Sequence, residues 1–206
     1  MDQNLKSSLI NKAKALAIFT IAYNLIEGVI SVYFGIEESS VSLAGFGVDS
    51  FIEVFSAMIV FWKITGHETS ANKEKIALRG IGLLFMVLAI TTFGSAVYQL
   101  FSGKHPETTI PGVLISTISL SFMFWLWRSK KRIGEALNDP VILGDAACSL
   151  ACIQLSVVLF SGSIAYWIFP SLWWADGVAA VALTYFIAKE GVEYLRAEPG
   201  EDHCCC

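Results

Sequence analysis

The sequence predicts an all-α membrane protein in which six transmembrane helices form one bundle and both ends of the chain are cytoplasmic. Of the 206 residues, 55% are hydrophobic and only 16% are charged. Soluble domains carry about 25% charged residues, so this composition is typical of a membrane protein. Six long apolar stretches and a one-sided distribution of basic residues predict the same fold.

The apolar stretches set the number of helices. A helix needs roughly 20 apolar residues to cross the hydrocarbon core, because each residue adds about 1.5 Å to its length. Six segments meet this requirement: 15–35, 41–62, 77–101, 109–127, 141–168 and 171–195. They leave no room for a folded domain outside the membrane. We therefore expect a polar leader over 1–14, one transmembrane domain over 15–195 and a cytoplasmic tail over 196–206.

The basic residues predict the orientation, because Lys and Arg gather in the cytoplasmic loops of membrane proteins. All of the 14 Lys and Arg residues except Lys104 lie before the first stretch, between the second and third or at the start of the third, between the fourth and fifth, or near the end of the sixth. Arg128 and Lys130 are thereby assigned to a cytoplasmic loop, and no Lys or Arg is assigned to the hydrophobic part of a span. The expected location is the cell (inner) membrane.

Two pairs of side chains have the spacing of metal ligands: Asp49 with Glu53, and Cys148 with Cys152. Residues four apart on a helix share one face, about 6 Å apart between their Cβ atoms. A carboxylate in the hydrocarbon core costs on the order of 3 kcal/mol, so two acids without a basic partner require a bound cation or protons. The two pairs together offer two oxygen and two sulfur ligands to a divalent metal ion.

Each pair also has a simpler interpretation. The two acids could hydrogen-bond to Ser, Asn or water inside the bundle, and buried cysteines often serve only as small apolar side chains. Asp145, three residues before Cys148, favours the metal site. A disulfide between Cys148 and Cys152 does not fit a regular helix.

Other polar residues are candidates for supporting roles. Glu27, with Asn24 on the same face, either lines a proton or ion path or hydrogen-bonds across helices. Asp176 either belongs to the pathway or is a solvated charge at a helix start. The consecutive cysteines beside a histidine predict a tail that captures metal or is lipid-modified, namely His203, Cys204, Cys205 and Cys206. A reducing cytoplasm disfavours disulfides there.

At these residues the chain resembles the cation diffusion facilitator, or cation efflux, family of six-helix metal–proton antiporters. Segment 42–53, SLAGFGVDSFIE, is similar to the family's second helix, and Asp49 and Glu53 fall on its two ligand positions. Segment 174–180, WADGVAA, resembles the start of the sixth helix, with Asp176 on the usual Asp.

Segment 144–152, GDAACSLAC, resembles the family's fifth helix, with Asp145 on its first Asp. Cys148 and Cys152 replace the family's His and Asp ligands, and Glu53 replaces the commoner Asp. The family's cytoplasmic domain is not expected here, because only about ten residues follow the last span. The resemblance therefore implies a short form that would dimerise through transmembrane helices.

The expected function is proton-coupled efflux of zinc, cadmium, mercury or lead from the cytoplasm, with the metal as substrate and no organic cofactor. Thiolates are soft ligands and favour the heavier cations, whereas zinc also suits a tetrahedral site of this kind. The expected partners are the lipid bilayer, protons as counter-ion and a second copy of the chain, without nucleic acid. The chain is not expected to be an enzyme.

Two other functions stay open. A membrane sensor or carrier would bind metal through the same ligands without transporting it. A membrane thiol oxidoreductase would use Cys148 and Cys152, but the chain lacks a CxxC motif.

Overall fold

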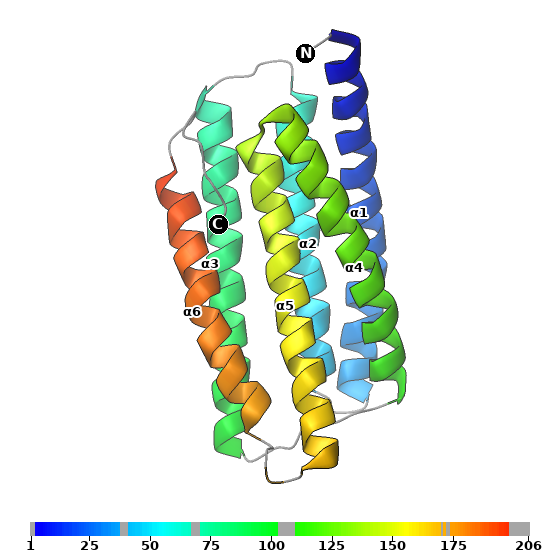
Figure 1. Cartoon of the computed structure of the whole chain (residues 1–206), viewed down its shortest axis with the longest axis vertical. Helices are drawn as coiled ribbons and strands as arrows, with labels where there is room; N and C mark the ends of the chain where they lie inside the picture. Colours follow the sequence, from blue (N-terminus) through cyan, green and yellow to red (C-terminus); the bar gives the residue numbers. More distant parts are fainter. Residues whose placement is uncertain are drawn as a thin grey trace.

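The computed structural model describes residues 3–37, 41–66, 71–102, 110–169, 171 and 174–197. Within them, six helices run alternately up and down the long axis of one bundle (Figure 1). These helices are α1 (Gln3–Glu37), α2 (Val41–Thr65), α3 (Ala71–Ser102), α4 (Ile110–Leu137), α5 (Pro140–Ile168) and α6 (Ala175–Arg196). The expected bundle of six helices is confirmed, and residues 3–14 of the expected leader form the first turns of α1.

Four of the helices, α1, α2, α3 and α5, are long and apolar enough to cross a membrane by length and composition. Over the residues that the structure describes, α4 and α6 are not long and apolar enough by the same two criteria. In α4 the described side chains begin only at Thr117. In α6 the second half carries Lys189, Glu190 and Glu193.

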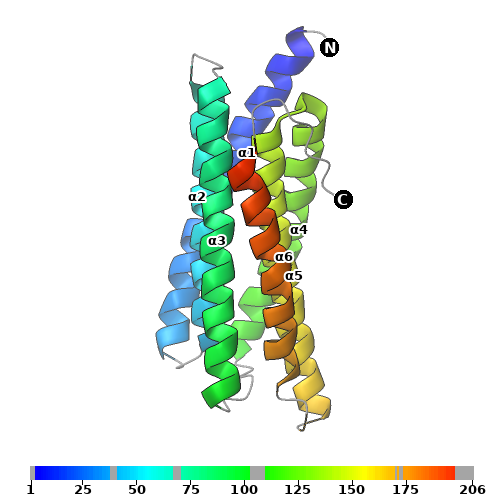
Figure 2. The same ribbon diagram turned by 90° about the vertical axis from the view of Figure 1, so that its left-hand side faces the viewer.

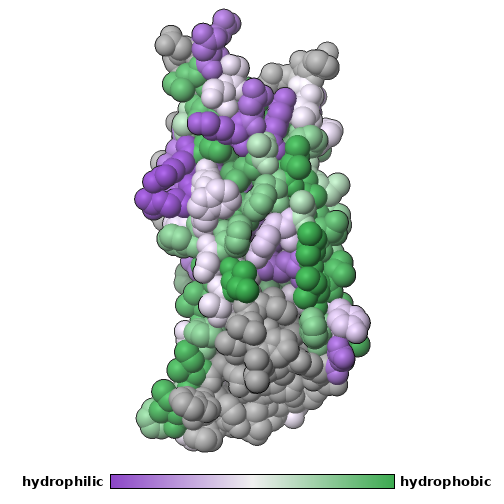
Figure 3. All heavy atoms as spheres, turned by 90° about the vertical axis from the view of Figure 1, so that its right-hand side faces the viewer, coloured by the Kyte–Doolittle hydropathy of each residue, from purple (hydrophilic) through white to green (hydrophobic). Residues whose placement is uncertain are grey.

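The surface is apolar over much of its length. Figure 3 shows one face on which hydrophilic side chains gather toward the end that carries the N-terminus, while hydrophobic side chains cover most of the rest that is coloured. On α1 the exposed side chains include Leu25, Ile26 and Val29. An apolar surface of this extent suits contact with lipid.

Two helix pairs are packed closely enough for their backbones to touch. A Cβ atom on Gly47 of α2 would lie 2.9 Å from the carbonyl oxygen of Gly28 in α1. In the other pair, a Cβ atom on Gly82 of α3 would lie 2.8 Å from the carbonyl oxygen of Gly191 in α6. Figures 1 and 2 both show α3 and α6 side by side. Small residues at these crossings allow the close approach.

The connection between α4 and α5 corrects one expectation. The basic segment that was assigned to a loop belongs to α4, which continues to Leu137. Only two residues separate the helices: Asn138, with a φ of 49°, and Asp139. The Asp139 carboxylate caps α5 by accepting hydrogen bonds from the backbone N–H groups of Val141 and Ile142. Lys130 is therefore helical, and its side chain is only 2% exposed.

The same capping residue joins three helices at this end of the bundle. The Lys63 ammonium of α2 lies 2.7 Å from the Asp139 carboxylate. It also lies 3.5 Å from the carboxylate of Glu74 in the first turn of α3. This half-buried triad fixes the ends of α2, α3 and α5 relative to one another.

The glycine contact between α3 and α6 gives a stability prediction. Gly82→Ala should lower the unfolding free energy by about 1–3 kcal/mol, because the new methyl group would overlap backbone atoms of α6. Gly94→Ala is the matched control in the same helix, since its Cβ would meet nothing within 4 Å. The control should be neutral or gain about 0.5–1 kcal/mol from helix propensity. Thermal unfolding in detergent, followed by circular dichroism, measures both. Equal melting temperatures would contradict the close contact.

Candidate metal site

The core of the bundle contains a set of buried polar side chains, most of them on α1, α2, α4 and α5. Burying such groups inside an apolar bundle is costly unless they are hydrogen-bonded, and the ionisable ones among them are candidates for function. The side chains are those of Thr20, Asn24, Glu27, Ser31, Ser50, Glu53, Ser56, Ser119, Lys130, Asp145, Ser149, Ser156 and Thr184.

The two predicted ligand pairs come from α2 and α5, which contact each other in the bundle. Glu53, Cys148 and Cys152 are buried, whereas Asp49 is half-buried. The Cys152 thiol lies against the Cys148 thiol and within electrostatic range of both Asp49 and Glu53. The i, i+4 spacing therefore directs both pairs into the same region, as the sequence predicts.

The two oxygens of Glu53 differ in their surroundings. Its Oε2 accepts a hydrogen bond of 3.2 Å from the Asn24 side-chain amide, which reaches across from α1. The same oxygen lies 3.7 Å from the Lys130 ammonium. Its Oε1 is buried and has no hydrogen-bond partner among the described residues. A buried carboxylate oxygen without a partner is costly, so this atom is suited to accept a cation or a proton donor.

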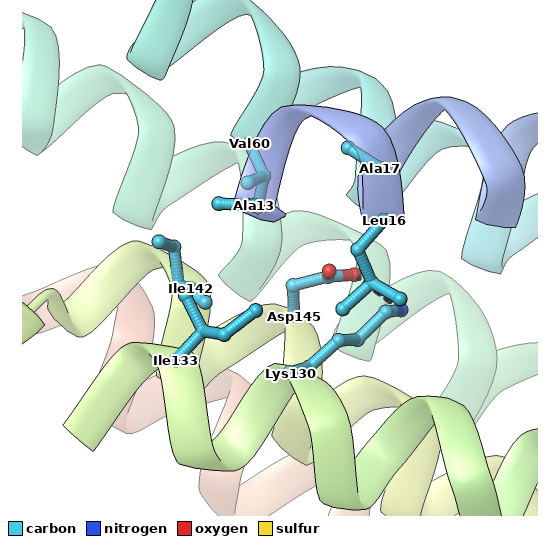
Figure 4. A pocket seen from close by; sticks show the side chains of 8 residues that line it. All are labelled: Ala13, Leu16, Ala17, Val60, Lys130, Ile133, Ile142 and Asp145. Atoms are coloured by element: carbon cyan, nitrogen blue, oxygen red, sulfur yellow. Dashed lines mark hydrogen bonds and ion pairs between the residues drawn. The ribbon is translucent and has the colours of Figure 1, made fainter. Parts of the chain in front are cut away.

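Lys130 brings a positive charge into the core, where the sequence predicted none. Its ammonium lies 3.1 Å from Asp145 Oδ1 and donates to the Ser149 hydroxyl at 2.9 Å. Figure 4 shows the Lys130 and Asp145 side chains at a small cavity that α1, α2, α4 and α5 line. The expectation that the two predicted acid ligands lack a basic partner is therefore wrong for Glu53. A long aliphatic chain lets a lysine near a helix end bury its stem and reach inward.

The other acids have separate environments. Glu27 accepts hydrogen bonds from the Tyr23 hydroxyl at 3.2 Å and from the Ser50 hydroxyl of α2 at 3.1 Å. Of the two roles expected for Glu27, the hydrogen bond across helices is thus present. The side chain of Asp176 lies outside the part of the chain that the structure describes, and so does the whole tail segment 203–206.

The four predicted ligands lie in one region of the bundle without forming a metal cage. Across the described ranges, no group of three or more His, Cys, Asp or Glu side chains is placed to hold a metal ion. Two groups beside Glu53 were not predicted as members of the site: the Asn24 amide, which donates a hydrogen bond to it, and the Lys130 ammonium, which lies 3.7 Å away. The sequence does contain one indication that Lys130 is helical. No Gly or Pro interrupts 113–133, so a helix could continue through the basic segment.

Comparisons with known proteins give a family match over most of the chain. Residues 13–198 match the cation efflux transmembrane domain. The chain is similar to transmembrane protein 163 of Xenopus laevis, with 24% identity over 188 residues. That alignment covers 89% of this chain and 66% of the relative, so the chain spans about two thirds of the relative's length. The matched domain and the apolar helices together make this a multi-pass membrane protein.

Proposed function

The chain belongs to the cation efflux family, and on this premise we propose that it transports a divalent heavy-metal cation out of the cytoplasm in exchange for protons. Family membership confirms the resemblance found in the sequence and agrees with the expectation that the chain is not an enzyme. The proposed substrates are zinc, cadmium, mercury and lead. The proposed ligands are Asp49, Glu53, Cys148 and Cys152.

The observation that carries this proposal is the Oε1 of Glu53, which has no hydrogen-bond partner among the residues that the structure describes. This oxygen is fully buried, and the Glu53 carboxylate lies within electrostatic range of Cys152. A metal ion bound to Glu53 would satisfy the oxygen. The proposed coordination by Asp49 and both thiols requires α2 and α5 to move relative to each other, because these side chains do not form a closed group with Glu53 in this structure.

The choice of ligands predicts a preference among metals. Thiolate is a softer donor than the His and Asp that the family's fifth helix usually carries. The site should therefore bind cadmium, mercury and lead more strongly relative to zinc. Zinc stays in the proposed range because Cys and carboxylate both suit its tetrahedral coordination.

The proposed transport cycle uses rigid helices around a central site. Rocking of helices would open the site to one side of the membrane and then to the other, as in many secondary transporters. Protons would replace the metal on the acids, so the empty site would not carry bare negative charge across the bilayer. The basic end of the bundle would face the cytoplasm. A second copy would pack through transmembrane helices.

The ligand assignment predicts a loss of transport. Asp49→Asn and Glu53→Gln keep the side-chain shape but remove one charged ligand each, so cadmium uptake into proteoliposomes should fall about tenfold or more. Glu193→Gln is the matched control, because Glu193 is an exposed acid paired with Lys189 at 3.8 Å on α6.

Normal uptake by both ligand variants, at normal protein levels, would refute the site. A folded protein that binds cadmium through these residues but gives no flux in sealed vesicles would identify a sensor or carrier in place of a transporter.

The two cysteines should control selectivity. Cys148→His with Cys152→Asp introduces harder donors, so the ratio of cadmium to zinc transport should fall by about tenfold. Because both positions are buried, Cys148→Ser with Cys152→Ser provides a second test with side chains of nearly the same size. Competition between the two metals in proteoliposomes measures the ratio. An unchanged ratio in both double variants would show that the thiols do not contact the metal.

Proton coupling gives a third prediction. Metal binding displaces protons from acids and thiols, so the apparent affinity for metal should weaken as the pH falls. In vesicles with an acidic lumen, collapsing the pH gradient at constant external pH should slow metal entry into the lumen. A metal-sensitive dye in the lumen measures the rate. Flux that does not depend on the gradient would indicate a uniporter and leave the ligands unaffected.

A further inference from the structure

We propose that Lys130 is a tethered cation that occupies Glu53 when the site is empty and competes with the metal for that carboxylate. This inference rests on the proposed function, because it takes Glu53 to be a metal ligand. It assigns a role to a residue outside the four proposed ligands and to a helix, α4, that contributes none of them.

The position of the ammonium supports direct competition. Lys130 extends from α4 to groups on α2 and α5, the two helices that carry the proposed ligands. It is also within electrostatic range of Cys148. A metal ion bound to Glu53 and the thiols would therefore lie beside this ammonium. A metal ion and an ammonium group at such a short distance repel each other strongly, because the buried interior screens charge poorly.

The contacts of Lys130 are unequal in a way that permits release. The ammonium lies 3.1 Å from Asp145 and 2.9 Å from the Ser149 hydroxyl, both on α5. Its distance to Glu53 Oε2 is longer, at 3.7 Å. Lys130 can therefore lose Glu53 to a metal while it keeps both partners on α5. Asn24 stays bonded to the carboxylate from the α1 side, which keeps Glu53 oriented during the exchange.

Competition of this kind has two consequences. The metal-free site stays compensated, because Lys130 balances part of the charge of Glu53 and Asp145. The loaded site is weakened, because the ammonium can return to Glu53 as the metal leaves. Lys130 should therefore lower the affinity for metal and increase the rate of release.

The test uses the full chain purified in detergent and titrated with Cd²⁺, with binding followed by sulfur-to-cadmium charge-transfer absorbance. Lys130→Gln removes the charge and keeps an amide that can donate to Asp145 or Ser149. We expect it to bind Cd²⁺ about tenfold more tightly than the wild type, and to show a lower maximal transport rate in proteoliposomes. Lys130→Arg keeps the charge and should stay within about threefold of the wild-type affinity.

A double variant with unchanged net charge distinguishes competition between Lys130 and the metal for Glu53 from an effect of the net charge of the site. Lys130→Met with Asp145→Asn removes one positive and one negative charge, so the net charge of the site is unchanged. Tight binding by both the Gln variant and the double variant supports competition at Glu53. Wild-type affinity in the double variant would overturn it in favour of net charge alone. Unchanged or weaker binding by a folded Lys130→Gln protein would also overturn it.

Two further samples distinguish this proposal from the proposed function. If the folded wild type binds no Cd²⁺, the metal site itself fails, and the competition fails with it. If the wild type binds and Glu53→Gln does not, the site stands, and the Lys130 variants alone decide the competition. Size-exclusion profiles and helical content establish that each variant is folded. The Gln variant keeps the test decisive if the double variant does not fold.

Discussion

The buried contact of the Lys130 ammonium with Asp145 and Glu53 is the interaction on which the polar core depends. It joins α4 to α5 and α2 through atoms that are almost completely shielded from the surroundings. Removing one partner of a buried ion pair costs about 3–5 kcal/mol, because the remaining charge is left uncompensated. Charged Glu53 and Asp145 can therefore lie inside an apolar bundle only together with this lysine or with another cation, and otherwise must bind protons. This constraint links the stability of the bundle to the occupancy of its centre.

The polar core around Lys130 lies in a bundle that contains two closely packed helix pairs. The α1–α2 and α3–α6 pairs share the most extensive contacts, and glycines bring their backbones together. Contacts between α2 and α5 are fewer, although these helices carry the predicted ligands. The Lys63–Asp139 ion pair fixes α2 to the start of α5 at one end of the bundle. Relative motion of α2 and α5 would then be smallest near Asp139 and larger farther along the helices, toward Asp49.

The sequence predicts the helices well because apolar length and turn residues are local properties. The fifth span was expected over 141–168, and α5 is Pro140–Ile168. Because residues four apart share one face of a helix, the approach of Cys152 to Cys148 also follows from local spacing. Contacts between helices do not, because they depend on register: Asn24 and Glu53 are 29 residues apart, and no local pattern pairs them. Lys130 was misplaced for a different reason, since basic residues near span ends normally mark a cytoplasmic loop. That pattern gives the side of the membrane but not the direction of a long side chain.

Under the proposed function, the cysteines and the lysine would address opposite requirements of transport. A substrate must bind well enough to enter a site and weakly enough to leave it. Buried thiols beside carboxylates favour tight binding of soft cations, and tight binding slows release. An ammonium held on Asp145 and Ser149, within 3.7 Å of Glu53, acts in the other direction because it offers the carboxylate an alternative partner. On this interpretation, replacing His and Asp by two cysteines is compatible with transport because Lys130 lies next to them.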